Sequence, residues 1–240
     1  MKSEQAQYSV PSPAATDGAL SSIVTRFAVH VSALAAFTLV MVWTLHFRGG
    51  ASWSQGDDVE KVFNLHPILM VTAFVVLASK GAVAFKVIPG PRAVVKLIHS
   101  GIQFAAILIG AVGIAAVFRY GGLNDPPAPK VYSLHSWMGI VTYGLVLAQW
   151  LGGLLAFVLP TAAPPARRSV VPYHAFVGTF LYVLGLATAS LGILEKVTFL
   201  QDYGTFGYHA KELYVANCLG LTICVTGATV LVDAARAVEG

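Results

Sequence analysis

Charged residues are scarce in this chain: Asp, Glu, Lys and Arg together make up 11% of its 240 residues. A soluble domain carries about 25% charged residues. Apolar residues reach 56%, and this balance indicates a membrane protein. The net charge of +4 falls in loops and does not indicate nucleic-acid binding. The sequence also lacks a Gly-x-Gly-x-x-Gly run and a P-loop, which argues against nicotinamide, flavin or ATP chemistry within this chain.

Cysteine is nearly absent, with only Cys218 and Cys224 in the whole chain. Neither belongs to a Cys-x-x-Cys-His motif, so a covalently attached haem of the c type is excluded. Any haem would be bound non-covalently, as haem b. We expect both thiols to be small packing residues in an apolar helix.

Six apolar stretches are long enough to cross a membrane, which takes about 20 helical residues. They cover residues 27–46, 63–85, 93–118, 131–159, 171–194 and 212–232. The predicted fold is therefore an all-α membrane protein with six transmembrane helices and short loops, without room for a soluble catalytic domain. We expect a polar, disordered tail at 1–25, the transmembrane domain at 26–235 and a second tail at 236–240.

Basic residues are distributed unequally between the two sides of this six-helix arrangement. Nine of the 15 Lys and Arg residues fall on the side of the two termini. Because short cytosolic loops are enriched in Lys and Arg, this bias predicts that both termini lie in the cytosol.

Four histidines, each near one end of its own apolar stretch, are the most informative feature. They are His66, His99, His135 and His174, separated by 33, 36 and 39 residues. Each interval is about one membrane crossing plus a loop, so the four alternate between the two faces. His66 and His135 then lie near one face, and His99 and His174 near the cytosolic face. Two facing imidazoles supply both axial ligands of a haem iron, so the pattern predicts two haem b per chain and a transmembrane electron carrier.

The other histidines do not fit this alternation. His30 and His46 lie at opposite ends of the first apolar stretch, and we assign them packing or interface roles. His209 lies in a loop, where we expect it to be solvated.

Five segments around these positions resemble the cytochrome b561 family, and in particular its eukaryotic, plant-like ascorbate-dependent ferrireductases and monodehydroascorbate reductases. The segments are FNLHPILM, KLIHSGIQ, YSLHSWMGI, VPYHAFVGT and LGILEKVTF. The resemblance covers about residues 24–234. It implies a homodimer of six-helix subunits in a vacuolar, endosomal or plasma membrane, in which the middle four helices hold two b haems. The implied ligand pairs are the same: His66 with His135, and His99 with His174.

The resemblance also implies that ascorbate is the cytosolic electron donor and that basic residues near the inner haem hold it. The matching residues are Lys86, Arg92, Lys96 and Arg167. Ascorbate is an anion at neutral pH, so a cluster of cations raises its local concentration. Lys96 precedes His99 by about one helical turn and shares its face. The alternative is that these cations only set the topology.

The opposite face departs from the family pattern. Relatives of this kind often carry a His-Asn pair before the YSLHSW motif, whereas FRYGGLNDPPAPKVYSLHSW has no such histidine and is two residues longer. Asn124 and Tyr132 are the candidate contacts for an acceptor, either monodehydroascorbate or a ferric chelate.

Two other functions stay open. One is a haem-b membrane subunit that takes electrons from a protein partner. The other is a transporter whose histidines bind a metal or relay protons, although four histidines at two faces cannot form one tetrahedral zinc site. We also expect no carboxylate within the membrane. The acidic residues that we place in loops or at span ends are Asp57, Asp58, Asp125, Glu195, Asp202 and Glu212.

Overall fold

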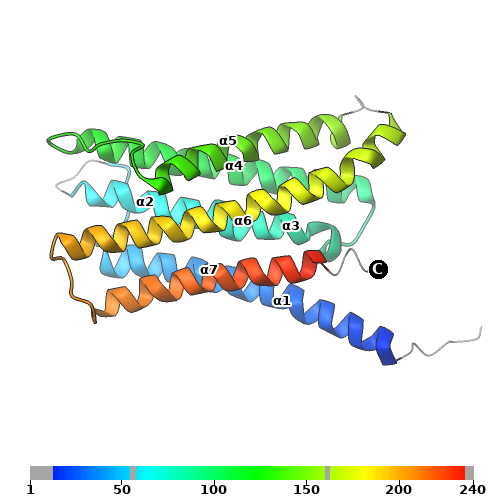
Figure 1. The fold of residues 1–240 in the computed structure, drawn as a ribbon, viewed down its shortest axis with the longest axis horizontal. Coiled ribbons are helices and arrows are strands. Elements are labelled where there is room, and N and C mark those ends of the chain that lie inside the picture. Colours follow the sequence, from blue (N-terminus) through cyan, green and yellow to red (C-terminus); the bar gives the residue numbers. More distant parts are fainter. Residues whose placement is uncertain (1–12, 55–57, 160–162, 236–240) are drawn as a thin grey trace, which may run out of the picture.

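A computed structural model describes residues 13–54, 58–159 and 163–235 of the chain. The described residues contain six long apolar helical spans, and consecutive spans run antiparallel (Figure 1). They are Leu20–Phe47, Glu60–Val87, Arg92–Leu123, Leu134–Val158, Pro164–Asp202 and Lys211–Ala235. All six predicted spans are confirmed. The fifth is much longer than predicted, because its helix continues beyond the apolar stretch at both ends.

The spans are built from seven α-helices and three π-helical segments. The α-helices are α1 (Pro13–Met41), α2 (Glu60–Met70), α3 (Ala78–Val87), α4 (Arg92–Leu123), α5 (Leu134–Gly153), α6 (Pro164–Asp202) and α7 (Lys211–Ala235). Val42–Phe47 continues α1, Val71–Leu77 joins α2 to α3, and Leu154–Val158 continues α5. Short π-helical segments are often found beside functional sites, and the third begins directly after Gly153, a residue of the site described below.

The helices that carry the four histidines form one part of the bundle, and α1 and α7 pack along its side (Figure 1). In the bundle, α2 and α3 pack against α4, and α5 packs against α6. The α1 and α7 helices pack against each other, and Val29 and Val40 on α1 and Leu219 and Ile223 on α7 are fully buried. Large apolar side chains such as Phe176 point outward and are exposed, as expected for helices whose outer surface is covered by lipid.

Local signals determine where the histidine helices begin. Ser133 caps α5: its hydroxyl accepts a hydrogen bond from the amide of Ser136, and the Ser136 hydroxyl accepts one from the amide of Ser133. This capping box places His135 in the first turn of the helix. Proline occupies the first turn of α6, where its missing N–H is not needed.

The expected disordered tail at 1–25 is wrong for residues 13–25, which belong to α1. Residues 1–12 and the tail at 236–240 lie outside the described residues. Arg167 and Arg168, which precede the predicted fifth stretch at 171–194, lie in the first turns of α6.

Candidate haem sites and a basic cavity

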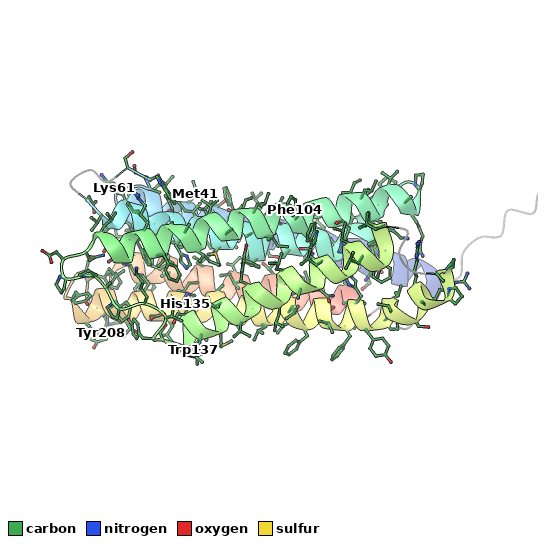
Figure 2. The ribbon with its side chains drawn as sticks, turned by 90° about the horizontal axis from the view of Figure 1, so that it is seen from above. Met41, Lys61, Phe104, His135, Trp137 and Tyr208 are labelled. Atoms are coloured by element: carbon green, nitrogen blue, oxygen red, sulfur yellow. The ribbon has the colours of Figure 1, made fainter. Side chains whose placement is uncertain are left out.

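The four histidines come together as two facing pairs. The ring centroids of His66 on α2 and His135 on α5 are 6.0 Å apart, with the ring planes at 85°. Those of His99 on α4 and His174 on α6 are 6.3 Å apart, at 71°. His135 lies in the same half of the bundle as Lys61 and Tyr208 (Figure 2). These are the pairs that the alternation in depth predicted.

The distance within each pair fits a shared haem iron. A metal–imidazole bond is about 2.0 Å long, and the ring centre lies about 1.1 Å beyond the nitrogen. Two imidazoles on opposite sides of one iron therefore have ring centres about 6 Å apart. Each site offers two histidines instead of the four ligands that tetrahedral zinc requires. The geometry suits axial ligation and not a structural zinc site.

Hydrogen bonds at Nδ1 orient three of the four rings. Nδ1 of His66 lies 3.0 Å from the carbonyl oxygen of Gly113, and Nδ1 of His99 lies 2.8 Å from that of Gly81. Nδ1 of His135 lies 2.9 Å from the carbonyl oxygen of Thr188. A carbonyl can only accept, so Nδ1 carries the proton and Nε2 keeps its lone pair for a metal.

Two glycines make room for the rings, and the sequence analysis missed them. A Cβ atom on Gly153 would lie 2.8 Å from Cε1 of His174. A Cβ atom on Gly192 would lie 2.7 Å from Cε1 of His135. Both distances are well below van der Waals contact, so a larger residue at either position displaces the ring. Glycine itself was the available signal, but its partner ring lies on a different helix.

A cavity of about 500 Å³ adjoins the second pair. Its lining includes His99 and His174 and, from α3 and α4, the predicted cations Lys86, Arg92 and Lys96. Arg167 is at the same end of the bundle, near the start of α6, but does not line this cavity. The structure therefore brings three of the four predicted cations to the inner histidine pair.

A buried carboxylate balances part of this positive charge. The Asp233 residue on α7 is only 3% exposed. Its Oδ2 lies 2.8 Å from Nζ of Lys86 and its Oδ1 lies 3.2 Å from Nε of Arg26. The Lys86 ammonium also donates to the Asp233 backbone carbonyl. Asp233 lies in the last turn of α7, two residues before that span ends, and its burial and ion pairs could not be predicted from the sequence.

Other carboxylates lie at the opposite end of the bundle. Glu60 accepts hydrogen bonds from Tyr120 (2.6 Å) and from Lys196 (2.8 Å), and the Lys196 ammonium lies 4.0 Å from the centre of the Phe63 ring. Glu212 was expected at a span end, and it is indeed in the first turn of α7. It is buried there, however, and accepts a hydrogen bond of 2.8 Å from the Trp43 indole.

The two candidate acceptor contacts flank the loop between α4 and α5. The amide of Asn124 donates to the backbone carbonyl of Tyr120 at 2.7 Å, at the end of α4. Tyr132 is 57% exposed, just before α5. Partial burial, and then the nearby charge of Glu195, raise the pKa of the Tyr132 phenol. Both residues lie at the same end of the bundle as His66 and His135.

Six antiparallel spans that hold two facing histidine pairs define a transmembrane protein of the b-type cytochrome class. Residues 65–200 match the family model of the eukaryotic cytochrome b561 proteins, and the chain belongs to this family. Membership implies haem b as the cofactor.

Several relatives are similar over most of the chain. A probable ascorbate-specific transmembrane electron transporter of Oryza sativa subsp. japonica is 42% identical, with 87% of each chain covered. Transmembrane ascorbate ferrireductase 1 of Arabidopsis thaliana is 34% identical, over 90% of this chain and 88% of the relative. A lysosomal membrane ascorbate-dependent ferrireductase of Danio rerio is 34% identical, over 89% of this chain and 88% of the relative.

Proposed function

We propose that this protein transfers electrons across a membrane from ascorbate to a one-electron acceptor on the other side, through two haem b groups per chain. The observation that carries the proposal is the pair of facing histidine sites at opposite ends of one bundle, each with ring centres about 6 Å apart. The names of the relatives, which include ascorbate-specific electron transporters and ascorbate ferrireductases, support ascorbate as the donor.

In this proposal, His66 and His135 would hold the outer haem, and His99 and His174 would hold the inner haem. Each haem supplies a centre that accepts and releases one electron. Backbone carbonyls hold Nδ1 of His66, His99 and His135, which would leave Nε2 of each ring free to bind a metal. A haem held by two histidines would favour electron transfer over oxygen binding.

Ascorbate binds, we propose, at the cytosolic mouth of the inner cavity. Arg92 and Lys96 line that cavity beside His99 and attract the ascorbate anion. Lys86 contributes less net charge because Asp233 is its partner, and Arg167 adds positive charge at the same end of the bundle. The cavity is lined mostly by apolar residues, and the three cations in its lining are suited to a small anion, whereas a protein donor would need a docking surface. This favours ascorbate over the alternative of a haem-b membrane subunit that serves a protein partner.

At the opposite end, Asn124 and Tyr132 are the proposed contacts for the acceptor, which is monodehydroascorbate or a ferric chelate. The ferrireductases among the relatives support a ferric acceptor. We further propose a homodimer with both termini in the cytosol, in a vacuolar, endosomal or plasma membrane. Transfer of one electron outward across 100 mV, cytosol negative, is then favoured by about 2.3 kcal/mol.

The experiment that tests the proposal is a measurement of haem content and reducibility. The purified protein should contain two haems per chain by the pyridine haemochromogen assay, and acid-acetone should extract both. Ascorbate should reduce them in part or in full, and a ferric chelate should reoxidise them. A folded protein that lacks haem, or haem that ascorbate does not reduce, contradicts the proposal.

A further inference from the structure

His174 differs from the other three paired histidines in the group that faces its Nδ1. The other three rings point Nδ1 at backbone carbonyl oxygens. Nδ1 of His174 instead lies 3.1 Å from Nε2 of Gln149, a side chain on α5. The same Nε2 donates to the backbone carbonyl of His174 at 2.7 Å. Among the four paired histidines, only His174 has a side chain as the partner of its Nδ1, and a substitution can remove that side chain.

The side chain of Gln149, on α5, packs against Gly178 and His174 on α6. A Cβ atom on Gly178, one turn after His174, would lie 3.3 Å from Nε2 of Gln149, so glycine leaves space for the amide. Both Gln149 and His174 line the inner cavity. The amide is thus held beside the ring by packing as well as by hydrogen bonds.

Ligation of a metal changes what Nδ1 of His174 requires. A neutral imidazole that binds iron through Nε2 carries its proton on Nδ1, which becomes a donor. An NH2 group cannot accept that proton, whereas the amide oxygen of Gln149 can. The side chain must turn about its terminal bond to bring the oxygen to Nδ1, and it must also move away from the His174 carbonyl oxygen, which lies 2.7 Å from the present position of Nε2. The His174 carbonyl released by this turn lies inside α6 and retains the intrahelical bond from the residue four positions later.

We propose that Gln149 is the positioning residue of the inner haem: its amide oxygen accepts the Nδ1 proton of His174 and sets the reduction potential of that haem alone. The inference rests on the proposed function, because it takes His174 as an axial ligand. A stronger acceptor at Nδ1 makes an imidazole a better electron donor to iron, which stabilises the ferric state. Gln149→Glu should therefore lower the potential of the inner haem, and Gln149→Leu should raise it.

Gln103 offers a matched control. It lies on α4, lines the same cavity and contacts Gly81, and no hydrogen bond joins its amide to the four paired histidines in the described part of the chain. Gln103→Glu introduces the same negative charge into the cavity without an acceptor at Nδ1. Gln103→Leu removes an amide of the same size. A comparison of the two positions separates the hydrogen bond from the general effect of charge.

The test is a redox titration of the haem-loaded, full-length protein, followed by absorbance and by the low-spin EPR signal of each haem. The signal that His174→Ala removes identifies the inner haem. At fixed applied potential, each Gln149 variant should change the oxidised-to-reduced ratio of that haem about tenfold, or about 59 mV for one electron, in opposite directions. The outer haem should not move. Gln103→Leu should shift the inner haem less than Gln149→Leu does, and Gln103→Glu should lower its potential less than Gln149→Glu does.

Several results would overturn the inference and leave the proposed function intact. These are two retained haems with unshifted potentials, shifts of the same sign in both Gln149 variants, or equal shifts from Gln103 and Gln149. If Gln149→Leu loses the inner haem, Gln149→Glu decides: retention at a lower potential supports the inference, and loss from both variants reduces Gln149 to a packing residue. If His174→Ala leaves both haems in place, the proposed function itself is wrong.

Discussion

Gly153→Ala is the sharpest test of how the inner histidine pair is built. The added Cβ would lie 2.8 Å from Cε1 of His174. Carbon atoms in favourable contact are about 3.5–4.0 Å apart. Either the ring or the helix backbone must therefore move by about 1 Å. The ring cannot tilt freely, because its centre must stay about 6 Å from that of His99 for both to bind one iron.

The magnitude follows from the cost of overpacking. Methyl groups inserted into a well-packed interior cost about 1–3 kcal/mol, and functional geometry tolerates displacements of about 0.5 Å. If the cost falls on ligation, haem affinity at the inner site drops about 5- to 150-fold. We expect the haem content of purified Gly153→Ala protein to fall from two per chain towards one, with the outer haem unchanged.

The assay is pyridine haemochromogen content together with the reduced-minus-oxidised spectrum. Gly152→Ala is the matched control, because a Cβ atom at the neighbouring position meets nothing within 4 Å; it should retain two haems. Gly192→Ala should remove the other spectral component, since its Cβ would lie 2.7 Å from Cε1 of His135. A Gly153→Ala protein with two haems and an unchanged spectrum would refute the reasoning that glycine makes room for the ring.

Three further predictions concern the pairs, the donor site and the buried carboxylate. His66→Ala and His135→Ala should remove the same spectral component, and His99→Ala the other; a component shared by His66→Ala and His99→Ala contradicts the pairing. Lys96→Ala should slow reduction by low ascorbate about tenfold, because a charge-assisted contact contributes about 1.5 kcal/mol or more. Both haems should remain, and dithionite should still reduce them. If the dependence on ascorbate is unchanged, Lys96 does not bind ascorbate and contributes only to the membrane topology. Asp233→Asn leaves two cations without their buried counter-charge and should destabilise the fold by about 3 kcal/mol, seen as a lower unfolding temperature; an unchanged temperature would show that the ion pairs contribute nothing.

The number of spans and the depth of the four histidines could be predicted from the sequence alone. Both depend on local properties: the length of apolar helix that a bilayer requires, and the reversal of the chain at each loop. His66 and His135 must lie towards one face and His99 and His174 towards the other in any packing of those spans. The helix ends were less predictable. Residues 13–25 and the first turns of α6 are polar yet helical, since a helix can continue past the hydrocarbon.

The environment of each ring was decided only by the tertiary structure. The contacts of Gly153 with His174 and of Gly192 with His135 join different helices, and nothing in the spacing of the sequence relates their members. The same holds for Asp233. In the sequence it is an acidic residue at the end of a span, and only the packing of α7 beside α1 and α3 places its carboxylate against Lys86. In the sequence, Gln149 is a polar residue in an apolar stretch, and nothing there indicates its partner. Its place beside Nδ1 of His174 follows from how α5 packs on α6, because helix rotation and register are determined by side-chain packing across the interface and not by hydrophobicity along the chain.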